Sequence, residues 1–427
     1  MNARIITQWL AFVFAFQVAR GLSAEGLVAL ADWEVAPPVA ESRVKAGRYP
    51  SFFLLFGLDW VASTSDETGR VNLSDFGPVE EGSSATVFAR SSVYSSSAKS
   101  VNAQLVCDER MEVYLNHEQV FVDVDGLIVL ELRKGLNQIF LQISSSSGVW
   151  DFAARMEGPL EGLAGEEDRL SVVWETEGLN VPESVIHDAE RGVFYVSNYA
   201  QFGETPTGFL SRVSLEGDLL EREWVSGLAN PTGLLLHEDT LFVVERRSLT
   251  AIDPETGKVR QRYPFPPGSF YNDVMVDDFG VIYVSDTSPA VGAQDVIALV
   301  DGGFEAWVSG SDLARVNGLH FHQGKLIAGS TGLAAVKSID VSDGSIETVT
   351  TLAGGILDGI RSFSDGTLIV SQWEGGIFLV GMDGALSRLL VSPGTKMNVA
   401  DFEFVREKGL LVVPTFYGNK LIGYRVD

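Results

Sequence analysis

The sequence offers almost no sulfur chemistry. Its 427 residues include one cysteine, Cys107, and five histidines. A single cysteine excludes an intrachain disulfide and a zinc site built from cysteines. Cys107 lies in the apolar stretch AQLVCDERMEVYL, so we expect a buried thiol within a strand and no nucleophile.

Positive charge is also scarce. The chain has 31 Lys and Arg residues against 57 Asp and Glu residues, a net charge of −26. Nucleic acids and anionic membranes need a basic surface, so both are excluded as partners. An acidic surface of this kind fits affinity for cations, although solvation alone accounts for most of the charge.

Long hydrophobic runs are missing except at the N-terminus. There Arg4 precedes an apolar run from Ile5 to Ala19, and the small residues of GLSAEG follow. The run is shorter than the ~20 residues of a membrane span. We therefore expect a signal peptide over residues 1–24, cleaved near Ala24, and a secreted or periplasmic protein with no membrane span in the mature chain. An uncleaved anchor is the alternative.

Helix-forming stretches rich in Ala, Glu, Lys, Leu and Arg are absent, and a repeat of β character takes their place. Six segments place a turn residue before an apolar strand, as in GVFYVSN and GVIYVSD. They recur at spacings of 47, 41, 44, 42 and 42 residues, measured between Phe194, Leu241, Ile282, Leu326, Leu368 and Leu410. An all-β period of this length is typical of propeller blades.

Each repeat contains four apolar strands, but the last lacks its fourth because the chain ends. The stretch LSVVWETEGLNVP, from Leu170, matches the fourth strand LEREWVSGLANP, from Leu220. A strand from before the first repeat would thus complete the last sheet and remove its open edge. We predict a closed six-bladed β-propeller from Arg169 to Asp427, with the domain taken as residues 166–427. Three tryptophans at matching outer-strand positions are interpreted as packing between strands: Trp174, Trp224 and Trp307.

Residues 25–165 lack this repeat. Their short alternating strands, such as SSATVFARSSVY and GLNQIFLQISS, predict a small β-sandwich of jelly-roll type. The run from MEVYLNHEQVF to SGVWDFAARM resembles the sandwich modules attached to bacterial carbohydrate enzymes. Carbohydrate or partner binding and a packing or spacer role are both open.

The first strand of each repeat would line the central channel and place one polar residue at its mouth. These residues are Glu183, Thr232, Asn272, Asn317, Asp358 and Asp401. A buried ring of carboxylates and amides is costly unless it is hydrogen-bonded or holds a cation. Two carboxylates and an amide suit a hard divalent ion with open coordination positions. A hydrogen-bonded ring without metal is the alternative. His320 and His322 share one strand face without a third ligand, which favours packing.

Four stretches in register resemble the metal-site blades of the gluconolactonase/regucalcin (senescence marker protein) family. They are PESVIHDAERGVFYVSN, YNDVMVDDFGVIYVSD, VNGLHFHQGKLIAGS and LDGIRSFSDGTLIVSQW. The resemblance covers roughly residues 169–427 and implies a six-bladed propeller that hydrolyses lactones with one divalent cation. Calcium is the first choice, with zinc, magnesium or manganese as alternatives.

The resemblance also implies roles for individual residues. Glu183, Asn317 and Asp358 would be the metal ligands, Asp358 also the base, and Asn272 would lie next to substrate or a metal-bound water. Two departures concern the substrate: Phe270 stands where the sugar-lactone enzymes have Arg, and Ser184-Val185 replaces Gly-Pro.

Two functions follow from this pattern. The first is a metal-dependent hydrolase of a small-molecule lactone or related ester, in which the cation acts as Lewis acid and Asp358 as base. Phe270 would then contact the substrate. The second is a non-catalytic propeller with a structural cation that binds a sugar or a protein. The retained set of Glu183, Asn317 and Asp358 favours the first.

Overall fold

A computed structural model describes residues 26–426 with internal gaps. The gaps are 45–46, 48–49, 51–57, 59–60, 78–83, 123–124, 146–149, 159–163, 166–168, 202–204, 268–269, 289–294, 311, 353–354, 374 and 392–397. The expected signal peptide, residues 1–24, lies outside the described residues. In the described part the chain forms strands and short 3-10 helices and no α-helix, which confirms the all-β prediction. Over the same residues, no helix has the length and apolar character needed to span a membrane.

The chain divides into two compact units, Met1–Gly162 and Leu163–Asp427. The first unit contains two antiparallel sheets. One follows the order β1 (Leu27–Ala29), β12 (Asp151–Glu157), β7 (Lys99–Cys107) and β10 (Asp125–Leu132), with β5 (Arg70–Asn72) paired to β12. The other includes β4 (Val61–Thr64), β2 (Asp32–Val35), β6 (Ala85–Ser95), β11 (Gly135–Ser145), β8 (Arg110–Leu115) and β9 (Glu118–Val122), with β3 (Val39–Ala40) on β6.

Both sheets of the first unit contribute to one hydrophobic core. Val87 of β6, Leu105 of β7 and Phe152 of β12 belong to a single buried cluster. Alternate residues of β7 and β12 are buried, as expected for strands with one face on a core. Cys107 lies in this cluster and is 8% exposed, and burial raises the pKa of its thiol to about 11. The prediction of a buried thiol within a strand is confirmed.

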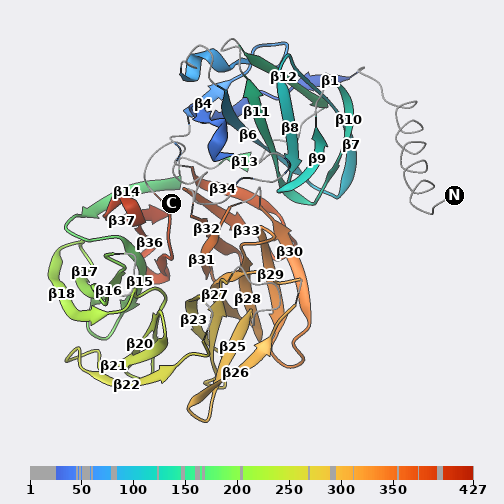
Figure 1. The fold of residues 1–427 in the computed structure, drawn as a ribbon. Helices are drawn as coiled ribbons and strands as arrows, with labels where there is room; N and C mark the ends of the chain where they lie inside the picture. The colour runs from blue at the N-terminus through green and yellow to red at the C-terminus, as the bar shows by residue number, and fades with distance from the viewer. Residues whose placement is uncertain are drawn as a thin grey trace. The chain divides into compact units, whose positions relative to one another are not determined.

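The second unit consists of four-stranded antiparallel sheets that follow one another along the chain (Figure 1), and one of them is extended by a short parallel strand, β13 (Ala164–Gly165). The first three are β15 (Pro182–Asp188) to β18 (Leu219–Leu228), β19 (Leu234–His237) to β22 (Val259–Pro264), and β23 (Tyr271–Val276) to β26 (Gly303–Val308). The next two are β27 (Val316–His322) to β30 (Ile346–Thr351) and β31 (Leu357–Ser362) to β34 (Leu386–Val391). The last combines β35 (Glu403–Val405), β36 (Leu410–Pro414) and β37 (Leu421–Val426) with β14 (Leu170–Thr176).

The first strands of these sheets form a closed cycle around one axis (Figure 1). Each contacts the next in the order β15, β19, β23, β27, β31 and β35, and β35 contacts β15. Hydrophobic clusters fill the space between neighbouring sheets. One such cluster joins Tyr195 of β16 to Val243 of β20, and another joins Val284 of β24 to Val244 of β20. The cycle therefore directs the first residues of every inner strand to one end of a shared axis.

The last sheet is completed by a strand from before the first one. β14 pairs antiparallel with β37, from Leu170 opposite Val426 to Thr176 opposite Leu421, as the sequence match predicts. Trp174 of β14 covers Gly423, where an added Cβ would lie 2.4 Å from the indole. The other two outer-strand tryptophans pack on tyrosines within their sheets. Trp224 stacks on Tyr195, with ring centroids 4.9 Å apart, and Trp307 packs on Tyr283 in a tilted arrangement, with centroids 4.5 Å apart.

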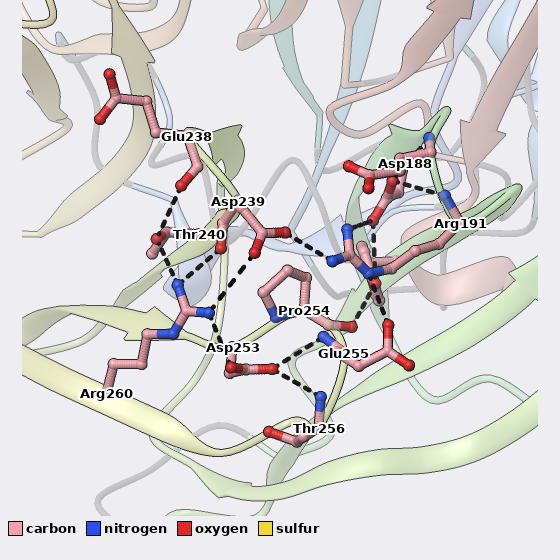
Figure 2. A network of polar contacts seen from close by, with 12 residues as sticks. Asp188, Arg191, Glu238, Asp239, Thr240, Asp253, Pro254, Glu255, Thr256 and Arg260 are labelled. Atoms are coloured by element: carbon pink, nitrogen blue, oxygen red, sulfur yellow. Dashed lines mark hydrogen bonds and ion pairs between the residues drawn. The ribbon is translucent and has the colours of Figure 1, made fainter.

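A polar network joins the first two sheets at the end of β15 opposite Glu183 (Figure 2). Arg191 is only 15% exposed and forms ion pairs with Asp188 at 3.0 Å, Asp239 at 2.6 Å and Glu255 at 3.2 Å. Arg260 extends the network to Asp253. Because one guanidinium serves three carboxylates, this network fixes the sheet-to-sheet contact more firmly than isolated surface pairs would. It lies at the far end of the strands from the predicted site.

If β14 completes the ring, Gly423→Ala should weaken the whole second unit. The added methyl group would overlap the Trp174 indole, and such overpacking costs about 1–3 kcal/mol. Urea unfolding of the full chain checks this. Gly303→Ala is the matched control, because its Cβ would have no neighbour closer than 3.9 Å. Equal stability of the two variants would contradict closure through β14.

Candidate functional site: a polar ring on bulged strands

Four of the six predicted ring residues lie at β-bulges. In β15 the register jumps between Pro182 and Ser184, so that Glu183 has no partner in β16. The same one-residue irregularity falls at Asn272 in β23, Asn317 in β27 and Asp358 in β31. A bulge inserts an extra residue and re-aims its side chain. The four inner strands thus carry the same local distortion at equivalent positions.

In three sheets, a serine hydroxyl of the second strand accepts a hydrogen bond from the backbone N–H that follows the bulge. Ser197 Oγ accepts the Ser184 N–H at 2.9 Å, and Ser285 Oγ accepts the Asp273 N–H at 2.9 Å. Ser371 Oγ accepts the Gly359 N–H at 2.7 Å. A buried N–H without an acceptor is costly, so the three serines stabilise the bulges. They are the serines of the repeated sequences VSN, VSD and VSQ.

Glycines after the ring residues allow the inner strands to approach one another. A Cβ on Gly318 would lie 1.5 Å from the Asp358 carbonyl oxygen of the next sheet. On Gly359 it would lie 2.8 Å from Asp401 Oδ1, and on Gly233 2.7 Å from the Asn272 carbonyl oxygen. Glycine therefore follows Asn317 and Asp358 for a steric reason. At these positions the next sheet lies too close to leave room for a side chain.

The ring residues are buried and two of them have unsatisfied oxygens. Glu183, Asn317 and Asp358 are 4%, 3% and 4% exposed, and Asn272 is 8% exposed. Glu183 Oε2 and Asn317 Oδ1 are buried without a hydrogen-bond partner. A buried polar atom without a partner costs about 1–3 kcal/mol. Two of the three predicted ligands thus carry a buried oxygen whose hydrogen-bonding capacity a cation could satisfy.

Three charged residues that the sequence prediction did not assign to the site belong to it. Asp273 accepts the Leu319 N–H of the next sheet at 2.7 Å. Asp401, counted only as a ring member, accepts the Ser184 hydroxyl at 2.7 Å and its N–H donates to the Glu183 carbonyl at 3.0 Å. Arg361 is 11% exposed, lies 3.3 Å from Asp401 and 3.7 Å from Glu403. These contacts cross the boundaries between sheets, which a repeat pattern does not reveal.

The site carries excess negative charge. Burial, followed by the charges of Asp358, Asp401 and Asp273, raises the pKa of Glu183 well above its ordinary value. Burial and the Asp401 charge likewise raise the pKa of Asp273 to about 8, although Arg361 opposes this shift. Four carboxylates against one guanidinium would leave three negative charges when all are ionised. Both raised pKa values mean that the ionised ring is unfavourable without a counter-charge.

The donor set fits a hard divalent cation. In the described residues, no three His, Cys, Asp or Glu side chains converge as a metal site by themselves. The amide of Asn317 would therefore be needed as a third ligand beside Glu183 and Asp358. Oxygen ligands of this kind suit calcium, which takes six to eight oxygens in general. The unsatisfied oxygens on Glu183 and Asn317 are the structural observation that supports the fit.

The backbone around Glu183 is strained and held by aromatic packing. Val181 and Phe416 have left-handed φ angles of 53° and 39°. A left-handed conformation is costly for β-branched or bulky residues and is found mainly where the surrounding structure enforces it. The Val181 N–H donates to Asn419 Oδ1 at 2.8 Å, and Phe416 packs on Trp373 with centroids 5.3 Å apart. These contacts fix the chain that leads into the Glu183 bulge.

The remaining predicted residues lie as follows. Phe270 precedes β23, is 41% exposed, and its N–H donates to Ser288 Oγ at 2.8 Å. His320 Nε2 lies 2.9 Å from Ser362 Oγ of the next sheet, and its ring is parallel to that of His322. The two histidines therefore pack between strands, as expected.

Comparison with known proteins finds similarity at the level of solved structures only. No family model matches the sequence, and no curated protein matches it. A virginiamycin B lyase from Staphylococcus aureus is 12% identical, with a TM-score of 0.46, over 60% of this chain and 100% of that one. A gluconolactonase from Xanthomonas campestris is 17% identical, with a TM-score of 0.43, over 60% and 99%. A luciferin-regenerating enzyme is 15% identical, with a TM-score of 0.45, over 59% and 94%.

These structures are β-propellers of low sequence identity to this chain. Likeness at this level does not transfer an activity, a ligand or a residue role. The function proposed below therefore depends on the residues of the chain itself.

The raised pKa values predict how stability responds to pH. The unfolded chain ionises Asp273 near 3.8, whereas the folded chain keeps its proton until about pH 8. In chelator, the free energy of unfolding should therefore fall as the pH rises from about 5 to 8, by up to about 1.4 kcal/mol per pH unit for each such group. Asp273→Asn should reduce this slope, and the exposed Asp278→Asn should leave it unchanged. Urea unfolding at several pH values measures it, and a slope unaffected by Asp273→Asn would contradict the shift.

Proposed function

We propose that residues 166–427 form a closed six-bladed β-propeller that holds one divalent cation at one channel mouth and hydrolyses a lactone or related ester. Glu183, Asn317 and Asp358 would hold the cation, with calcium preferred over zinc, magnesium or manganese. The observation that carries the proposal is the pair of buried oxygens without partners, Glu183 Oε2 and Asn317 Oδ1. The surplus of carboxylates around them supports it.

A bound cation would supply Lewis acidity, which polarises a carbonyl and stabilises the oxyanion that forms on it. The chain itself provides the proton transfer and the positioning. Asp358 would accept a proton from the attacking water. The Asn272 amide, at the bulge of β23, would orient substrate or water. Arg361 would hold Asp401 in place through their ion pair, and Asp401 in turn accepts the Ser184 hydroxyl.

Phe270 would influence which substrate is preferred. It is exposed beside the start of β23, at the position where the resembled sugar enzymes have Arg. An aromatic ring offers apolar contact and no hydrogen bond to a hydroxyl group. We therefore expect a less polar lactone or ester to be preferred over a polyhydroxylated one.

Two further proposals concern the rest of the chain. We propose that residues 1–24 direct export to the periplasm or the medium and that residues 25–165 are an accessory β-sandwich. Its ligand, if it has one, would be a carbohydrate or the surface of a partner. Mass spectrometry of exported protein would test the export proposal, and a full-length cytoplasmic product would contradict it.

Asp358→Asn should separate a hydrolase from a binding protein. The amide keeps an oxygen ligand but removes the base, so turnover should fall by ~10²–10⁴-fold, the usual contribution of general-base catalysis. Asn272→Ala should cost less, because it disturbs positioning only. The measurement is kcat/KM on a polar and an apolar lactone, with metal content recorded for each variant.

The control is Asp278→Asn, which alters an exposed carboxylate on the same sheet and should keep full activity. If the metal-loaded wild-type protein hydrolyses neither lactone, the hydrolase proposal is wrong. The alternative, a non-catalytic propeller that binds a sugar or protein around a structural cation, would then replace it.

A further inference from the structure

A second tier of residues lies beside the polar ring, two positions before each ring residue. In four sheets the backbone carbonyl of the tier residue accepts the N–H of the residue that directly follows the second strand, at 2.8–3.0 Å. The shared hydrogen bond places the four residues at equivalent positions at the ring end of the strands. The acceptors are Val181, Phe270, Arg315 and Ile356, and the donors are Tyr199, Thr287, Thr331 and Trp373.

Arg315 is the charged member of this tier, and its charge is uncompensated. It is half-buried, and its Nε is buried without a hydrogen-bond partner. Burial alone lowers the pKa of its guanidinium, and no carboxylate of the described residues offsets that burial. At the same offset from the other five ring residues the sequence has neutral side chains, namely Val181, Asn230, Phe270, Ile356 and Val399.

The backbone holds Arg315 in a costly conformation. Ala314 and Arg315 have left-handed φ angles of 45° and 67°, which residues other than glycine adopt mainly where the surrounding structure enforces it. The Arg315 N–H donates to Asp295 Oδ1 at 3.1 Å, and the Gly332 N–H donates to the Ala314 carbonyl at 2.9 Å. Asp295 is 8% exposed, and its Oδ2 accepts the Gly310 N–H at 3.0 Å. Both oxygens of Asp295 thus hold the backbone and leave the guanidinium charge unpaired.

Two threonines connect Arg315 with its surroundings. Thr331, whose N–H donates to the Arg315 carbonyl, is 7% exposed, and its hydroxyl has no hydrogen-bond partner. Thr287 donates its N–H to the Phe270 carbonyl and its hydroxyl to the Val316 carbonyl, each at 2.8 Å. Arg315 and Phe270 therefore occupy equivalent positions on adjoining sheets, one cationic and the other apolar and exposed.

We propose that Arg315 and Thr331 bind a carboxylate group of the ligand. A guanidinium donates paired N–H groups that match the two oxygens of a carboxylate, and a hydroxyl adds a third donor. A consequence, which rests on the proposed hydrolase function, is that the substrate has an acidic part and an apolar part. Its lactone or ester would lie at the ring, its carboxylate at Arg315 and its apolar part against Phe270.

Isothermal titration of the full chain with 3-phenylpropionate tests the site, and 3-phenylpropionamide is the uncharged comparison. The wild-type protein should bind the acid at one saturable site and the amide far more weakly. Arg315→Gln keeps a Cβ on the left-handed backbone but removes the charge. It should weaken binding of the acid by about 10- to 100-fold, the usual contribution of hydrogen bonds to a charged group.

Further variants separate the charge from the fold. Arg315→Lys keeps the charge without the planar fork and should bind the acid at an intermediate level. Thr331→Val removes one donor and should cost about 2- to 10-fold. The exposed Arg425→Gln is the matched control and should bind as the wild type does. Each titration is run in chelator and with calcium, because a carboxylate can also ligate a cation.

Equal binding of acid and amide by the wild-type protein would overturn the proposal, and this comparison needs no variant. So would binding of the acid that requires calcium and is the same in Arg315→Gln, since the carboxylate would then lie on the cation.

The substrate consequence is tested with one lactone that carries a free carboxylate and a neutral lactone of similar size. Arg315→Gln should raise KM for the first and not for the second. If the acid binds through Arg315 but neither lactone is hydrolysed, the hydrolase function fails while the carboxylate site stands. If both lactones are hydrolysed and Arg315→Gln leaves both KM values unchanged, the substrate consequence is wrong while the hydrolase function stands.

Discussion

One extra residue in each of four inner strands determines where the polar groups of this propeller unit lie. Without the bulges, a strand alternates its side chains strictly between two faces. The inserted residue breaks that alternation and frees Glu183, Asn272, Asn317 and Asp358 from pairing. Serine hydroxyls accept the amide groups at three of these bulges. Glycines at Gly318 and Gly359 admit the backbone of the next sheet.

This arrangement concentrates carboxylates where water is largely excluded. Their ionisation is opposed by burial and by mutual repulsion, as the raised pKa values of Glu183 and Asp273 indicate. Arg361 offsets part of the charge through Asp401. A divalent cation would offset more and would satisfy the two oxygens that lack partners. At the opposite end of the strands, carboxylate charge is compensated within the protein, because Arg191 forms ion pairs with three carboxylates (Figure 2).

The repeat in the sequence predicts the features that recur in every sheet, but it does not predict contacts between side chains of different sheets. The period in the forties predicts the four-stranded sheets, and the match of LSVVWETEGLNVP predicts the pairing of β14 with β37. Ring positions follow from their constant offset to the strands. Arg361 stands in the quoted stretch LDGIRSF, but nothing in that stretch indicates that its guanidinium turns to Asp401 on the next sheet. Likewise, nothing in the stretch YNDVMV indicates that Asp273 is a buried acid whose carboxylate accepts the Leu319 N–H of the next sheet.

Some of the missed features leave a trace that sequence reasoning can use. The serine of VSN, VSD and VSQ recurs because its hydroxyl accepts a hydrogen bond from a backbone N–H at the bulge of the neighbouring strand. A polar residue that recurs in a buried strand can therefore indicate a bulge in the strand beside it.

The central claim is that the bulged ring binds a cation, and calcium titration of metal-free protein tests it most directly. We predict one calcium ion per chain and, at 100 times the Kd, a rise in the free energy of unfolding of about 2.7 kcal/mol. Glu183→Gln and Asn317→Ala should each weaken binding, while the exposed Glu190→Gln should not. Absence of binding by calcium, magnesium, manganese and zinc, with an unchanged melting curve in chelator, would show that the ring is a hydrogen-bonded plug and would contradict the claim.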